Sequence, residues 1–214
     1  MKKLAVIFDM DGVITDSEPF YAEAVNVVLA GRGLVLTEED HRAIMGSSIE
    51  YTWQWVMEHF RLPGDISQWK APYDRAVVDI LGRKVERSPG LIELLDAIKQ
   101  RGLKIGLATS SQLNWAETVL ARLKVRERFL TVATTEMVAE AKPAPDIYLF
   151  AARQLGVAAA ACIAIEDSPR GIGSAKNAGI TTVAVRTPST EGMDISAADY
   201  IVDSLGEFDL GWLE

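Results

Sequence analysis

The sequence predicts an α/β protein: a doubly wound parallel sheet whose chain is interrupted by an all-helical insertion. Short apolar runs bounded by turn residues recur along the chain, which is typical of buried parallel strands. Segments with helical periodicity separate these runs, as crossover connections require. The length of 214 residues fits one domain of roughly 100–200 residues with a modest insertion.

The predicted strands come in chain order at about 3–9, 103–109, 129–133, 161–166, 180–185 and 199–202. Start and stop residues mark three helices between them. Pro89-Gly90 opens the first, and Gly102 follows its end. The second runs from Asp146 to Leu155 and is closed by Gly156, and Ser168-Pro169 opens the third. These alternations indicate βα units.

The segment 17–84 breaks the alternation because it reads as helical throughout. We therefore expect a core made of residues 1–16 and 85–214, with 17–84 as a helical cap. An insertion directly after the first strand would lie over the carboxyl ends of the strands, where open α/β sheets bind their ligands.

Charge and composition exclude several classes of protein. The net charge is −8 and the pI is near 4.9, which disfavours binding to nucleic acid or to anionic lipid. No segment approaches the roughly 18 apolar residues of a membrane span. The apolar run before Asp9 is too short for a signal peptide, and the single Cys162 cannot form an internal disulfide. We expect a cytoplasmic protein, monomeric or weakly dimeric, that acts on a small molecule.

Two acids, Asp9 and Asp11, follow the first predicted strand and are two residues apart. If the extended geometry continues, both side chains lie on the same side and repel each other. A hard divalent cation with oxygen ligands resolves that repulsion, and Mg²⁺ suits a small carboxylate site that also binds phosphate. The alternative is an ordinary Asp-Gly turn after a strand.

Hydroxyl groups and a lysine follow the next two strands. Thr109, Ser110 and Ser111 could bind a phosphate together with backbone N–H groups, although for this motif taken alone a plain helix cap is the favoured explanation. Lys142 lies before Pro143 on a stiff backbone and could neutralise phosphate charge, although most lysines lie on the surface.

A second pair of acids, Glu166 and Asp167, follows the fourth strand. Either residue could simply favour the positive end of the following helix. However, all four motifs lie at the carboxyl ends of predicted parallel strands, which share one edge of the sheet. Their convergence favours one site over four unrelated strand endings.

In this order the motifs resemble those of the haloacid dehalogenase superfamily of phosphatases and phosphomutases, over nearly the whole chain. The stretches 142–148 (KPAPDIY) and 166–172 (EDSPRGI) are similar to the subgroup that contains β-phosphoglucomutase and sugar-phosphate phosphatases. This resemblance implies a Rossmann-like catalytic core with a helical cap.

The resemblance also implies roles for individual residues. Asp9 would attack phosphorus, and Asp11 would protonate the leaving alcohol and later activate water. Mg²⁺ would be held by Asp9, the backbone carbonyl of Asp11 and Asp167, with Glu166 close by. The residues implied to contact the phosphoryl group or the rest of the substrate are Thr109, Ser110, Ser111, Lys142, Gly46 and Ser47.

The cap departs from the mutase pattern. Tyr21 aligns with a histidine of the mutase, and Ile49-Glu50 follows the turn where the mutase has a phosphate-binding arginine. A mutase must hold a second phosphate, so hydrolysis of a small phosphorylated metabolite, most simply a sugar phosphate, is favoured over phosphosugar mutase chemistry. A phospho-accepting receiver-type signalling domain is a remote alternative, since such domains have about half this length and carry no helical insert.

Overall fold

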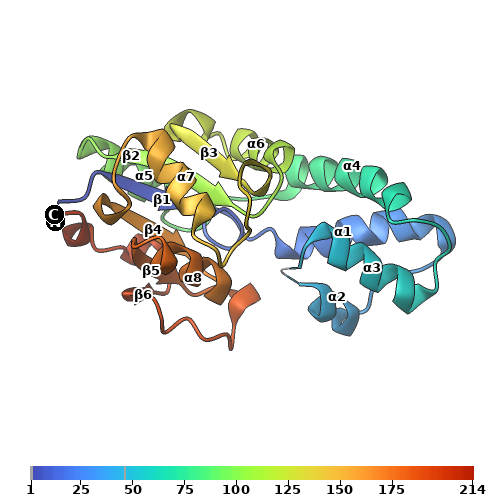
Figure 1. Ribbon diagram of the computed structural model, residues 1–214. Coiled ribbons are helices and arrows are strands. Elements are labelled where there is room, and N and C mark those ends of the chain that lie inside the picture. The colour runs from blue at the N-terminus through green and yellow to red at the C-terminus, as the bar shows by residue number, and fades with distance from the viewer. Residues whose placement is uncertain (1, 46) are drawn as a thin grey trace. The chain divides into compact units, whose positions relative to one another are not determined.

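The computed structural model describes residues 2–45 and 47–214 (Figure 1). The chain forms two compact units. One contains Met1–Asp16 and Glu86–Glu214 and is called the sheet unit here; the other contains Ser17–Val85 and is called the helical unit.

A six-stranded parallel sheet forms the centre of the sheet unit (Figure 1). The strands are β1 (Ala5–Phe8), β2 (Lys104–Thr109), β3 (Thr131–Thr134), β4 (Cys162–Glu166), β5 (Thr181–Val185) and β6 (Tyr200–Val202). Their order is β3-β2-β1-β4-β5-β6, and every neighbouring pair is parallel. The predicted doubly wound parallel sheet is confirmed, with strand ends that differ from the expected ones by at most two residues.

The strand order creates a topological switch point beside β1. The chain builds outward from β1 through β2 to β3, and then returns to place β4 on the other side of β1. All four residues of β1 are buried, as expected for a central parallel strand covered on both faces. Open α/β sheets form their ligand crevice where the winding reverses in this way.

Helices cover both faces of the sheet. They are α5 (Leu91–Gln100), α6 (Leu113–Arg122), α7 (Asp146–Leu155) and α8 (Pro169–Asn177). On one face, α7 and α8 join a buried cluster to which β1 contributes Ala5 and Ile7. The intervening Val6 and Phe8 point to the other face, because side chains alternate along a strand.

The helix boundaries follow the local start and stop residues. The side chain of Ser168 caps α8 by accepting from Gly171 N, and α7 ends at Gly156 in the left-handed conformation. Short 3-10 helices occupy Ala30–Arg32, Arg126–Arg128, Thr135–Met137, Ala159–Ala161, Pro188–Thr190, Leu205–Glu207 and Leu210–Leu213.

The helical unit contains α1 (Glu18–Leu29), α2 (Glu38–Ile44), α3 (Ile49–Phe60) and α4 (Ser67–Lys84). An aromatic group forms part of its core: Trp53 stacks on Trp69 at 5.3 Å between ring centroids and meets Tyr73 edge-on at 5.7 Å. Over the two described ranges, no helix combines the length and the apolar character needed to cross a membrane.

Candidate active site

The sheet brings four of the predicted motifs to one edge. Asp9 follows β1, Thr109 ends β2, and Glu166 and Asp167 lie where β4 ends. The backbone N–H of Asp9 donates to Ile165 O at 2.9 Å, which ties the first acidic residue to the strand that carries the other two. Lys142 reaches the same place from the loop between β3 and α7.

The Lys142 ammonium is the centre of this site. Its Nζ donates to Asp9 Oδ1 at 2.5 Å, to Glu166 Oε1 at 2.6 Å and to Ala108 O at 3.1 Å. The side chain is only 6% exposed, unlike a typical surface lysine. Burial alone would lower the pKa of Lys142, but the Asp9 and Glu166 carboxylates raise it above its usual value, so the ammonium stays charged.

Helix α8 fixes the backbone that carries Lys142. Arg170 Nη2 donates to Lys142 O at 2.7 Å, and Asn177 Nδ2 donates to Pro143 O at 3.0 Å. Ser174 Oγ donates to the next carbonyl, Ala144 O, at 2.5 Å. Residues at these spacings share one face of a helix, so a single face of α8 holds three consecutive carbonyls of the lysine loop.

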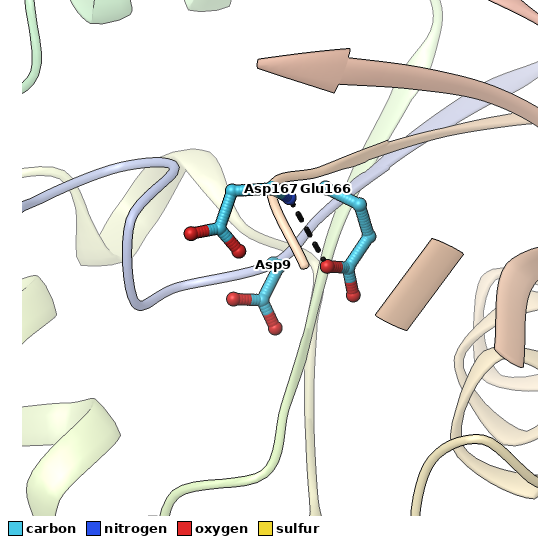
Figure 2. A group of neighbouring side chains, drawn as sticks. All are labelled: Asp9, Glu166 and Asp167. Atoms are coloured by element: carbon cyan, nitrogen blue, oxygen red, sulfur yellow. Dashed lines mark hydrogen bonds between the residues drawn. The ribbon is translucent and has the colours of Figure 1, made fainter. Parts of the chain in front are cut away.

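Three buried carboxylates lie close together beside this one ammonium. Asp9, Glu166 and Asp167 can each place one oxygen within 4.8 Å of the other two (Figure 2). Burial raises the pKa of Asp9 well above its usual value, with Lys142 opposing the shift. Burial together with the neighbouring Glu166 raises the pKa of Asp167 to about 8. Both acids are therefore hard to ionise together without another cation nearby.

The donor set fits a divalent metal ion. Three carboxylates and one ammonium leave two negative charges in excess when all are ionised, and a dication would neutralise them. All the candidate side-chain ligands are oxygens, which Mg²⁺ prefers. Figure 2 shows Asp167 and Glu166 turned to opposite sides, with Asp9 between the ends of the two side chains.

Glu166 belongs to this group, but protein donors already occupy its oxygens. Oε1 accepts from Lys142 Nζ and from Tyr148 OH at 2.8 Å. Oε2 accepts from Asp167 N at 3.2 Å and from Ser168 Oγ at 3.3 Å. A carboxylate has about four acceptor positions, so Glu166 is satisfied without a metal ion. Its contacts favour a role in holding Lys142, and its predicted role as a metal ligand stays a prediction.

Asp167 is positioned by a glycine and a threonine. Gly12 has a φ of +81°, and a Cβ built there would lie 2.0 Å from Asp167 Oδ2, so this position requires the absence of a side chain. Thr187 Oγ1 in the loop after β5 donates to the same oxygen at 3.3 Å. The contact lowers the pKa of Asp167 slightly against the stronger effect of burial.

Asp11 lies beside the hydroxyl motif. Its Oδ2 accepts from Ser111 Oγ at 2.9 Å and from Thr109 Oγ1 at 3.4 Å, while Thr109 Oγ1 accepts from Ser111 N at 3.0 Å. The hydroxyls predicted to bind phosphate therefore also hold the predicted acid/base. Ser110 is exposed.

The substrate contacts predicted in the helical unit stay predictions. Gly46 lies outside the described residues. Ser47 Oγ is 2.8 Å from Thr52 Oγ1, and Lys70 Nζ donates to the Glu50 carboxylate at 2.5 Å. The acid predicted to disfavour a second phosphate is thus paired with a lysine.

Sequence reasoning assigned no role to Tyr148, Thr187 or Arg170, although all three contact a predicted site residue. Tyr148 lies six residues after Lys142, in a stretch read only as a family motif. The spacing of Arg170, Ser174 and Asn177 on α8 was a usable signal for one polar helix face. No sequence pattern marked Thr187, because its contact with Asp167 depends on where the loop after β5 turns.

Comparison with known proteins gives a consistent result. The family described as haloacid dehalogenase-like hydrolase matches residues 6–185. A "Phosphorylated carbohydrates phosphatase" of Thermotoga maritima is 34% identical over 179 residues, covering 84% of this chain and 83% of the relative. "Hexitol phosphatase B" of Escherichia coli is 32% identical, covering 88% and 86%.

Solved structures agree with these sequence matches. CbbY of Rhodobacter sphaeroides in complex with phosphate superposes with a TM-score of 0.83 at 27% identity, covering 97% of this chain and 96% of that one. A beta-phosphoglucomutase of Clostridium difficile gives a TM-score of 0.81 at 25% identity, covering 99% and 95%. These similarities extend over both the sheet unit and the helical unit.

Proposed function

The chain belongs to the family of haloacid dehalogenase-like hydrolases, and we propose that this phosphoric monoester hydrolase removes phosphate from a small phosphorylated sugar or polyol with the help of Mg²⁺. The observation that carries the proposal is the contact of Asp9 with the buried Lys142 ammonium at 2.5 Å, at the switch point of the sheet. The names of the two phosphatase relatives support a phosphorylated carbohydrate as the class of substrate.

Asp9 is the proposed nucleophile. One of its carboxylate oxygens attacks phosphorus, the bond from phosphorus to the alcohol oxygen breaks, and an aspartyl-phosphate forms. Asp11, held by Ser111 and Thr109, gives its proton to the leaving alcohol. Asp11 then takes a proton from the attacking water, which releases inorganic phosphate and restores Asp9.

Lys142 stabilises the charge that builds up on the transferring phosphoryl oxygens, because a preorganised ammonium in a buried site is little screened by water. Asp9, Asp167 and the carbonyl of Asp11 would hold Mg²⁺. When bound, the metal ion supplies Lewis-acid stabilisation of the phosphoryl group and neutralises the excess of buried negative charge.

Intramolecular phosphoryl transfer between sugar hydroxyls is the second candidate, because a beta-phosphoglucomutase shares the fold at a TM-score of 0.81. Hydrolysis is favoured because a mutase needs a site for a second phosphate, and the Lys70 ammonium near the start of α3 is already engaged by Glu50. The family match over residues 6–185 disfavours a receiver-type signalling role.

The test is a panel of hexose, pentose and polyol phosphates with Mg²⁺, followed by assay of inorganic phosphate and of isomerised sugar phosphate. Stoichiometric phosphate release supports the phosphatase, whereas isomer formation without phosphate release would replace it with the mutase. Asp9→Asn should lower kcat by about 10⁴-fold or more, because the nucleophile is lost. Substantial activity in that variant, checked for a native fold by circular dichroism, would refute Asp9 as the nucleophile.

A further inference from the structure

The side chain of Tyr148 lies beside Lys142 and Glu166. It belongs to the first turn of α7, and it is fully buried. Its hydroxyl donates to Glu166 Oε1 at 2.8 Å, and the centre of its ring is 5.2 Å from Lys142 Nζ. The tyrosine therefore contacts both partners of the Lys142–Glu166 ion pair.

Packing alone explains the ring but not the hydroxyl. The ring is part of the apolar cluster beneath α7 and α8, which a phenylalanine would fill equally well. A buried hydroxyl is unfavourable unless it is hydrogen-bonded, so its placement against a buried carboxylate is a specific arrangement. The phenol hydroxyl is a hydrogen-bond donor, and Glu166 Oε1 accepts from it.

The hydroxyl limits how Glu166 can move. Glu166 Oε1 receives two donors, Tyr148 OH and Lys142 Nζ, and Oε2 receives two more from the two residues that precede α8. With all four present, the carboxylate has one satisfied orientation. That orientation directs Lys142 so that its ammonium also reaches Asp9 Oδ1. Without the tyrosine hydroxyl, Glu166 Oε1 would be free to turn and draw the ammonium away from Asp9.

We propose that Tyr148 is a positioning residue that holds Lys142 against Asp9 through Glu166. The chain of contacts runs from Tyr148 OH to Glu166 Oε1, from there to Lys142 Nζ, and on to Asp9 Oδ1. This inference rests on the proposed function, because it assigns Tyr148 to the same phosphoryl-transfer site. It adds a residue whose contribution is geometric: the ammonium stays in place while Asp9 accepts the phosphoryl group.

The test is Tyr148→Phe in the full chain, which keeps the ring and removes only the hydroxyl. We expect kcat to fall about tenfold with KM changed less than about twofold, because a small displacement of a catalytic group affects the transition state more than substrate binding. A crystal structure of the variant should show Lys142 Nζ withdrawn from Asp9 Oδ1. Tyr200→Phe is the matched control: it removes the same atom from the same unit, at a tyrosine that stacks on Trp212 and is 39% exposed.

The outcomes separate this inference from the proposed function. A lower melting temperature with unchanged kcat would mean that the hydroxyl only stabilises the fold, and would overturn the inference. Unchanged contact between Lys142 and Asp9 in the variant crystal structure would overturn it as well. If wild-type protein releases no phosphate from any substrate of the panel, the proposed function fails. In that case the inference is decided by the position of Lys142 in crystal structures of the wild type and of Tyr148→Phe.

Discussion

Replacement of Lys142 by methionine is the strongest test of the buried charge arrangement. Methionine keeps much of the length and volume of the side chain and removes the ammonium. The ammonium is 2.5 Å from Asp9 Oδ1 and 2.6 Å from Glu166 Oε1, and both carboxylates are buried. The variant therefore leaves two buried acids without their cation.

The expected cost follows from that geometry. Removing one partner of a buried ion pair destabilises a protein by about 3–5 kcal/mol, because the remaining charge stays buried and unpaired. For a chain of this size, each kcal/mol corresponds to a fall of about 2–4 °C in Tm. The loss of one preorganised charge at the transferring group should also lower kcat by about 10²–10³-fold.

The destabilisation caused by Lys142→Met should depend on pH. Burial already raises the pKa of Asp9 in the native protein, and Lys142 opposes this shift, so the variant raises that pKa further. An acid whose pKa is higher in the folded state contributes stability below its unfolded pKa and loses it as pH rises through the folded pKa. The difference in unfolding free energy between variant and wild type should therefore be larger at pH 8 than at pH 5.

Urea unfolding of metal-free protein at the two pH values measures this difference. Lys3→Met is the control, because Lys3 Nζ donates to two backbone carbonyls and to Thr181 Oγ1 rather than to a carboxylate. It should leave kcat unchanged and should not make the difference grow toward pH 8. If Lys142→Met behaves like this control in both respects, the reasoning about buried charge is refuted.

Two other predictions concern the acidic residues. In Gly171→Ala, the new Cβ would lie 2.0 Å from both Glu166 oxygens, so we expect about 1–3 kcal/mol of destabilisation and a lower kcat. In the control Gly173→Ala, on the same helix, the new Cβ meets only Pro143 Cβ at 3.5 Å, so this change should be neutral or stabilising. Equal changes in the unfolding free energies of the two variants, measured by urea unfolding, would contradict this explanation. The metal-free protein should lose stability as pH rises from about 4 to 8, since burial raises the pKa of Asp9, and burial with Glu166 raises that of Asp167 to about 8. Added Mg²⁺ should remove most of this loss in calorimetric scans, and a flat metal-free profile would show that the two acids are not destabilised by burial.

The sequence by itself determined the fold class and the edge of the sheet at which the candidate site lies. Apolar runs such as 5–8 and 162–165 fit buried strands, and the helices between them favour a parallel arrangement. Since parallel strands end on one edge, polar residues that follow them must gather there. The sequence therefore suffices to predict that Asp9, Thr109 and Asp167 lie together.

Only the tertiary structure decided how these side chains meet. From the sequence, Lys142 resembles any surface lysine before a proline. Its burial depends on Asp9, 133 residues earlier in the chain, and on Glu166, 24 residues later. Periodicity and turn residues report a residue's local conformation, but they carry no information on which distant oxygen lies within hydrogen-bond reach. The contact of Tyr148 with Glu166 arises because α7 packs against β1, β2 and β3, an arrangement that the local sequence does not specify.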